Sequence, residues 1–219
     1  TMGRHIKNTG GEDFVAMKNS TPGNDNSYPK VGPIVMTEIM YNPPMQGRWD
    51  NDEYEYIELM NISSSPVRLE ETVESEPEEG VIIREAVPWA FIDGIEFTFP
   101  GRDRAVTVAP SERILIVRNH EAFEDMYDVP SGVRIFEWES GRLNNDGEEL
   151  ELAMPGDQEW RQLRYMIRVD KVNFGDADPW PAGTDAEGKS LHRRSPTAAS
   201  ANYGNDPANW IARDPSPGR

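Results

Sequence analysis

Two groups of acidic residues carry the carboxylate oxygens from which proteins build calcium sites. The first group, in one short polar loop, is Asp50, Asp52 and Glu53. The second group, around Pro179–Pro181, is Asp176, Asp178 and Asp185. The first loop departs from the EF-hand pattern, because an aromatic residue stands where a third ligand belongs and the glycine of the sharp turn is absent. We expect both groups to be solvated polar loops, with calcium at Asp50, Asp52 and Glu53 as the alternative.

Glu38 and Glu58 stand in the middle of apolar stretches. A pair of carboxylates on two strands is the arrangement that hydrolyses glycosidic bonds by general acid–base chemistry. The chain has 39 acidic residues, so chance pairs are expected. We expect a protein that is not an enzyme. The enzymatic alternative is a metal-dependent hydrolase that uses the acidic clusters of the two loops.

Nucleophilic and metal-binding side chains are scarce. The chain has no cysteine, which excludes disulfides, thiolate metal sites and cysteine nucleophiles. Its three histidines, His5, His120 and His192, lack a partner at metal-ligand or catalytic spacing. Nucleophile-elbow, P-loop and dinucleotide-binding patterns are absent. The sequence therefore predicts no catalytic or cofactor-binding residues.

The basic run His192-Arg193-Arg194 offers two interpretations. It could hold an anion, or it could lie along an edge strand and pair with the surplus carboxylates, which is the interpretation we prefer. The chain has 22 basic against 39 acidic residues and a net charge of −17. Such a charge repels nucleic acid and anionic membranes and favours solubility.

Three of the six tryptophans, Trp49, Trp180 and Trp210, fall in loops beside Pro, Asp or Asn. Exposed aromatic rings in a row would indicate carbohydrate binding, whereas loop aromatics in β-sandwiches commonly close the ends of the core. We expect the second role and keep a carbohydrate-binding module as an alternative. No apolar run reaches the roughly 18 residues of a membrane span, so no membrane insertion is expected.

Short strands must position these side chains. Alternating or β-branched stretches between Pro, Gly and Asn turns predict strands at 13–17, 34–41, 55–59, 67–69, 81–83, 90–92, 95–99, 105–108, 113–117, 133–138, 149–154, 163–174 and 189–193. Asn119 is suited to cap a single short helix that reaches Tyr127. Residues 144–147 carry a hairpin-turn signal between strands 133–138 and 149–154. The stretch Glu70–Gly80, with six glutamates, predicts a solvated or partly disordered loop. The pattern as a whole predicts an all-β antiparallel sandwich or barrel.

The ends of the chain read as linkers. Residues 1–31 predict a linker with one strand, and residues 214–219 a second linker. Residues 16–23 resemble residues 211–218 in apolar, basic, hydroxyl, Pro and Gly positions. We therefore expect residues 1–31 to contain the end of a preceding repeat and residues 32–213 to form one complete domain.

Five segments stand in a fixed order within about residues 32–213: Ile34–Pro43, Glu53–Asn61, Asp93–Pro100, Ser140–Glu148 and Asp206–Trp210. Together they resemble the bacterial lamin tail domain. The resemblance implies an immunoglobulin-like β-sandwich without the disulfide, with one short helix and long loops in this chain. It brings no catalytic residues, and the places of Glu38 and Glu58 within it imply hydrogen bonds to loop backbone. The acidic insertion from Glu70 to Pro88 departs from the family pattern.

The resemblance implies a module of a larger exported bacterial protein, hence an extracellular or cell-surface location. The function expected is non-catalytic binding of protein or surface partners through loops and sheet edges, with further repeats in the same chain.

Overall fold

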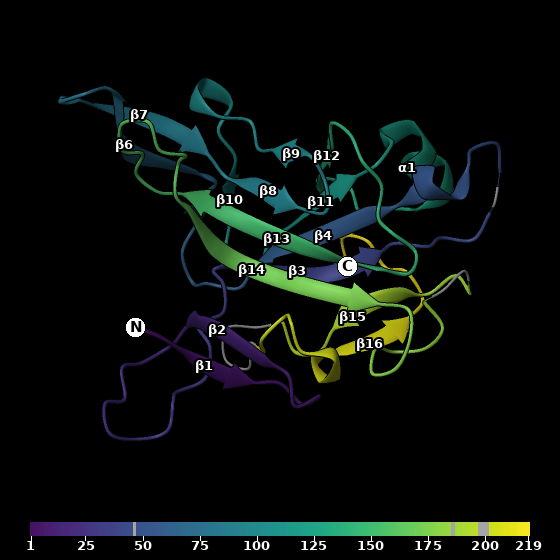
Figure 1. Ribbon diagram of the computed structural model, residues 1–219. Helices are drawn as coiled ribbons and strands as arrows, with labels where there is room; N and C mark the ends of the chain where they lie inside the picture. Colours follow the sequence, from purple (N-terminus) through teal and green to yellow (C-terminus); the bar gives the residue numbers. More distant parts are fainter. Residues whose placement is uncertain (46, 185–186, 197–201) are drawn as a thin grey trace.

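The computed structural model describes residues 1–45, 47–184, 187–196 and 202–219 as a mostly β structure with one α-helix (Figure 1). The expected all-β class is confirmed. The strands of these ranges form five sheets, two of which carry the main core.

The larger sheet has the strand order β12-β11-β4-β3-β15-β16. Its strands are β3 (Ile34–Met40), β4 (Tyr56–Asn61), β11 (Arg113–Val117), β12 (Arg134–Glu137), β15 (Ser190–Arg193) and β16 (Trp210–Arg213). All neighbours are antiparallel except β11 and β12, which run parallel. The chain between these two strands holds helix α1 (His120–Met126), and a parallel pair needs such a crossover.

The second sheet has four antiparallel strands in the order β14-β13-β8-β9. They are β8 (Ala90–Asp93), β9 (Phe97–Thr98), β13 (Gly147–Pro155) and β14 (Met166–Gly175). Its apolar side chains pack against those of the larger sheet in one core, in which Met36, Ile57 and Leu152 are fully buried. Each such side chain contributes about 1.5–3 kcal/mol by leaving water. Several smaller elements lie outside the two main sheets. Strands β5 (Val67–Arg68) and β10 (Thr107–Val108) form a two-stranded pair. Three short 3-10 helices are η1 (Asn51–Tyr54), η2 (Arg102–Arg104) and η3 (Pro207–Asn209).

Helix α1 covers one end of the outer face of the larger sheet. Phe123 of the helix packs with Met40, Tyr56 and Leu115 of the sheet. Asn119 caps the helix as expected, because its side chain accepts a 3.0 Å hydrogen bond from the Ala122 N–H.

The N-terminal segment is more ordered than a linker. Strands β1 (Met2–Ile6) and β2 (Glu12–Ala16) form an antiparallel hairpin, of which the sequence predicted the second strand alone. Val15 and Met17 form a small buried cluster with Tyr203. The Tyr203 hydroxyl donates to Asp13 Oδ2 at 2.9 Å. The partner residues come from the far end of the chain, so local sequence did not reveal them.

The loop prediction for Glu70–Gly80 is wrong. Strand β6 (Glu70–Glu78) pairs with β7 (Val81–Pro88), and the resulting hairpin extends from the body at the upper left of Figure 1. Val73 and Ser75 are buried on one side of β6, Glu74 between them is exposed, and Glu71 and Glu76 are half-buried. Glu74 lies opposite Arg84, whose Nη2 donates to it at 2.9 Å, and this pairing offsets part of the charge repulsion.

The predicted hairpin across residues 144–147 is also wrong. The turn exists, because the Gly147 N–H donates to the Asn144 carbonyl at 3.0 Å. However, the strands on its two sides belong to different sheets: β12 pairs with β11, whereas β13 pairs with β8 and β14. The turn therefore connects the two layers of the core.

The predicted linker at residues 214–219 instead packs on the larger sheet. Pro217 is buried, and the N–H groups of Ser216 and Gly218 donate to carboxylates of β3 and β4 at 3.0 and 2.8 Å. The backbone of this segment thus satisfies acceptors that would otherwise be buried without partners.

Candidate functional site

Glu38 and Glu58 lie directly opposite each other on β3 and β4, beneath residues 214–219. Glu38 accepts hydrogen bonds from the Tyr56 hydroxyl, the Ser190 hydroxyl at 2.6 Å and the Ser216 N–H. Nε2 of His192 lies 3.3 Å from the same oxygen of Glu38.

Glu58 has a separate set of donors: the Thr37 hydroxyl, the Arg113 guanidinium and the Gly218 N–H. Burial raises the pKa of both carboxyl groups. Hydrogen bonds from Ser190, Tyr56 and Ser216 oppose that rise in the pKa of Glu38, and the charge of Arg113 opposes it most strongly in the pKa of Glu58.

Glu38 and Glu58 are enclosed by the elements around them. The exposed fractions of Glu38 and Glu58 are 2% and 1%, so a substrate would reach them only after residues 214–219 had left. Their bonds to the Ser216 and Gly218 N–H groups are the backbone hydrogen bonds that the sequence led us to expect.

The first acidic loop does not converge on one point. Asp50 is exposed. Glu53 accepts from the Asn119 side-chain amide at 2.9 Å, and Asp52 lies 3.7 Å from Arg142. Across the described ranges, no group of three acidic or histidine side chains is placed to hold a metal ion by itself.

The second acidic group is equally open where it is described. Asp176 and Asp178 are exposed in the segment after β14. Asp185 lies outside the described residues.

The histidines are distributed over three places. The His5 ring packs edge-on against Tyr28 and Tyr203, and Nε2 of His120 lies 3.6 Å from Glu124 on α1. His192 is on β15, where burial lowers its pKa.

Arg193 serves the core. Its guanidinium is buried and donates to both oxygens of Asp170, at 2.6 and 3.2 Å, and Asp170 also accepts from the Met36 N–H at 2.9 Å. The expected pairing with a carboxylate is therefore present, although β15 is an inner strand and not an edge. Arg194 donates to the Trp210 carbonyl at 3.0 Å.

The three tryptophans expected in loops pack or bond inward, and Trp210 is not in a loop but is the first residue of strand β16. Trp210 is 1% exposed, and Trp180, partly buried, packs against the same core with the ring centroids 6.4 Å apart. Trp49 is half-buried and donates to Asp125 at 3.1 Å. This geometry gives no specific support to the carbohydrate alternative.

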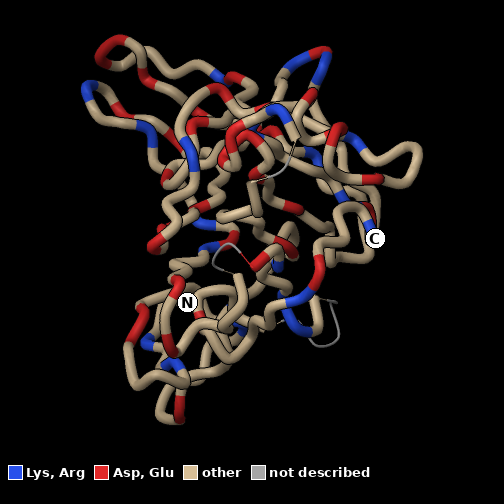
Figure 2. The backbone as a smooth tube through the Cα atoms, turned by 90° about the vertical axis from the view of Figure 1, so that its right-hand side faces the viewer, with Lys and Arg blue, Asp and Glu red and all other residues tan. Residues whose placement is uncertain are grey.

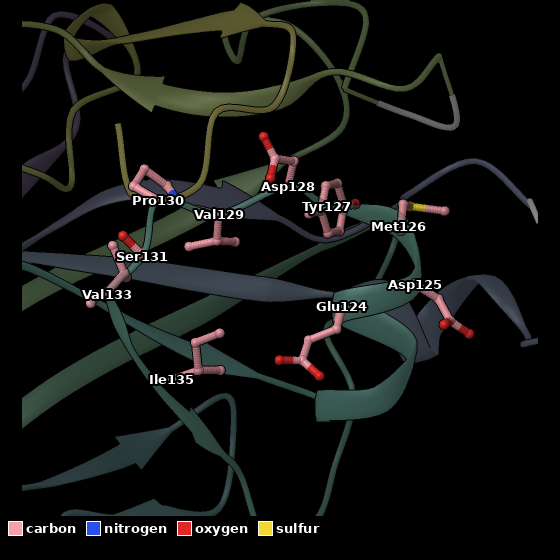
Figure 3. A pocket seen from close by; sticks show the side chains of 11 residues that line it. Glu124, Asp125, Met126, Tyr127, Asp128, Val129, Pro130, Ser131, Val133 and Ile135 are labelled. Carbon is pink, nitrogen blue, oxygen red and sulfur yellow. The ribbon is translucent and has the colours of Figure 1, made fainter.

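A hollow of about 590 Å³ lies between the end of α1 and residues 127–135 (Figure 3). Its three carboxylates, on Glu124, Asp125 and Asp128, point in different directions in the close-up. Asp125 bonds to Arg48 at 3.0 Å and Asp128 to Arg219 at 2.7 Å. This hollow therefore brings no set of groups to bear on a common ligand.

A smaller pocket of about 300 Å³ contains a group that sequence reasoning missed. It is lined by Asn51, Asp52, residues 142–146 and Glu55. Glu55 is fully buried, and within the part of the chain that the structure describes its Oε1 has no hydrogen-bond partner. Burial, the first cause, raises the pKa of Glu55 to about 9. A signal was present: Glu55 alternates with Ile57 and Leu59, which places it on the core side of its strand.

Acidic residues are spread along the described backbone in Figure 2. Of the described helices, none has the length and apolar character that crossing a bilayer requires.

The described residues form an all-β protein with buried, hydrogen-bonded carboxylates and an oxygen-rich pocket beside η1. No protein-family model matches the chain. No curated protein matches it either. The chain is similar to the crystal structure of a DUF4876 family protein from Bacteroides thetaiotaomicron, with 13% identity and a TM-score of 0.45 over 99% of this chain and 79% of that one. A similarity this distant assigns neither a family nor a function.

Proposed function

We propose that this chain is a non-catalytic interaction module that binds an extended segment of a partner protein along strand β7. The observation that carries the proposal is an open sheet edge. Strand β6 is bonded on its far side to residues 157–158, through Glu76 N–H to the Gln158 carbonyl and Gln158 N–H to the Glu74 carbonyl, both at 2.9 Å. Within the described ranges, β7 forms backbone hydrogen bonds with β6 alone, so its outer edge is free.

The outer half of β7 is unprotected. Val81, Ile82 and Ile83 are 44%, 58% and 42% exposed. Natural edge strands usually carry charges or proline that prevent pairing with another chain. In β7 such residues, Arg84, Glu85 and Pro88, begin only after Ile83. The uncharged, apolar stretch Val81–Ile83 is therefore a suitable place for a partner to add a strand, whereas the charges and proline protect the rest of β7.

Charge defines the partner further. The same hairpin carries four further glutamates, Glu74, Glu76, Glu78 and Glu79, and the whole chain has a net charge of −17. A basic segment with apolar residues at alternate positions would complement both features. The proposed occupant is therefore an extended, basic, β-forming stretch of another protein.

The proposal includes the fold type and the location that the sequence resemblance implies. The two packed sheets support an immunoglobulin-like sandwich of the lamin-tail kind. The location on a larger exported bacterial protein rests on the sequence resemblance alone. The similarity of residues 16–23 to residues 211–218 supports a tandem arrangement of such modules. An enzymatic role is not part of the proposal, because Glu38 and Glu58 are enclosed by structural partners.

A display library of extended peptides tests the binding proposal. We expect selection on the wild-type chain to enrich basic, alternating sequences that bind an Ile82→Lys variant at least about tenfold more weakly, since the variant adds like charge and a polar group at the edge. Leu163→Lys is the matched control, because Leu163 is an exposed apolar residue outside the hairpin. Equal loss in both variants, or no loss in either, would exclude β7 as the binding edge.

A further inference from the structure

Six of the eight residues that line the pocket of about 300 Å³ beside η1 carry side-chain oxygens: Asn51, Asp52, Glu55, Asn144, Asn145 and Asp146. The other two are Arg142 and Leu143. One wall comes from η1 and from Glu55, which follows it, and the other from the turn that joins the two sheets. Carboxylate and amide oxygens are the ligands that hard divalent cations prefer.

Glu55 gives this pocket a feature that a mere acidic surface lacks. The side chain is 0% exposed, and its Oε2 accepts a 2.8 Å hydrogen bond from the Leu143 N–H. Its Oε1 is buried and has no hydrogen-bond partner among the described residues. An ionised carboxylate oxygen buried without a donor is costly, because it has lost its water and gained nothing in return, so the carboxyl group holds its proton until a cation displaces it. A cation in the pocket would supply the missing partner.

We propose that this pocket binds a calcium ion, with Glu55 Oε1 and the Asp52 carboxylate as charged ligands and oxygens of residues 144–146 completing the site. The ligands come from two segments 88 positions apart, at the hydrogen bond between Leu143 and Glu55. An ion bound there would fasten the turn between the sheets to β4. This site differs from the one considered from sequence, since Asp50 and Glu53 do not line the pocket.

The nearby charge of Arg142 and the small number of carboxylates limit the calcium affinity of the pocket. Arg142 lies 3.7 Å from Asp52, but its side chain is 72% exposed and can turn into water when an ion binds. Because the described residues place no three carboxylates around one point, the ion would retain part of its water shell. We therefore expect the modest affinity of extracellular calcium modules, with a Kd on the order of 10⁻⁴ M.

Calorimetric titration of the chelator-treated chain with calcium chloride tests the proposal. The wild type is expected to bind one ion, and Glu55→Gln, which keeps the shape of the side chain, to bind at least about tenfold more weakly. Asp146→Asn is the second variant, because Asp146 is exposed and its replacement leaves the core untouched. It too is expected to weaken binding.

Asp50→Asn is the matched control, since it removes an acidic charge from the neighbouring loop outside the pocket. We expect it to bind calcium like the wild type. The proposal is overturned if the wild type takes up no calcium at millimolar concentration, if Glu55→Gln and Asp146→Asn both bind like the wild type, or if Asp50→Asn loses binding as they do. Thermal unfolding of each variant in chelator verifies that it folds, and calcium should raise the midpoint of the wild type and of Asp50→Asn alone.

Discussion

Glu38 and Glu58 face each other across β3 and β4, and each accepts a hydrogen bond from a different N–H group of the same C-terminal segment. Ser216 donates to Glu38, and Gly218 donates to Glu58. Two like charges side by side on a sheet repel each other. Separate sets of donors allow both to remain buried, and the segment 214–219 thereby becomes part of the domain.

The Ser216 N–H can be removed without touching the carboxylates. Ser216→Pro eliminates the donor to Glu38 and should lower the free energy of unfolding by about 1–3 kcal/mol, the cost of leaving a buried acceptor unsatisfied. Ser216→Ala keeps the N–H and loses a 3.5 Å hydroxyl contact alone, so it should cost less than about 0.5 kcal/mol. Urea unfolding of both variants provides the comparison. Equal stability of the two would mean that the N–H contributes nothing.

The buried ion pair between Asp170 and Arg193 should contribute strongly to the stability of the fold. Asp170→Asn leaves the buried guanidinium without its counter-charge and should destabilise the chain by about 3–5 kcal/mol. Asp214→Asn, at an exposed pair with Lys189, should leave the unfolding midpoint unchanged. Thermal unfolding measures both, and a small effect of Asp170→Asn would contradict the role given to this pair.

The pKa of Glu55 predicts a pH dependence in the presence of a chelator. The folded value of about 9 lies above the ordinary value of 4.5, so the unfolded chain loses this proton first as pH rises. The contribution of Glu55 to the free energy of unfolding is therefore greatest below about pH 4.5 and is lost as pH rises towards 9. Asp52 and Glu148 reinforce the raised pKa by charge repulsion, whereas the charge of Arg118 opposes it.

Glu55→Gln cannot ionise and isolates this effect, because all other titrating groups are shared with the wild type. The variant should gain stability relative to the wild type between about pH 5 and about pH 8, by at least about 1 kcal/mol. Urea unfolding at both pH values measures the difference. A constant difference would mean that the folded pKa of Glu55 is not raised.

The N-terminal hairpin should behave as part of the fold. Val15→Asp places a charge in the cluster with Met17 and Tyr203 and should release β1 and β2 from the body. Limited proteolysis should then cleave within residues 1–31 much faster than in the wild type. Phe14→Asp, at a 68% exposed neighbour on the same strand, is the control and should leave cleavage slow. Rapid cleavage of the wild type would restore the linker interpretation.

The sequence predicted correctly those elements whose signals lie within a few neighbouring residues. The strand at 34–41, the helix after Asn119 and the turn at residues 144–147 all occur, because alternation, a cap and turn residues act over a few positions. The hydrogen bonds of Glu38 and Glu58 to loop backbone were implied by the resemblance to the lamin tail domain and not by local pattern.

The features that were missed depend on distant residues. Strand β6 reads as a charged loop until its partner β7 and residues 157–158 are in place. The parallel pairing of β12 with β11 requires the helical crossover, which no strand pattern encodes. The Glu55 pocket forms only when Leu143, 88 residues away, comes to its carboxylate.

The central claim is that a partner strand adds to the free edge of β7, and amide hydrogen exchange tests it most directly. With a peptide selected from the display library bound, we predict slowed exchange at the amides of residues 81–83 that face away from β6. Unchanged exchange along β7, with protection at the loops around Trp49 or Trp180 instead, would contradict the account.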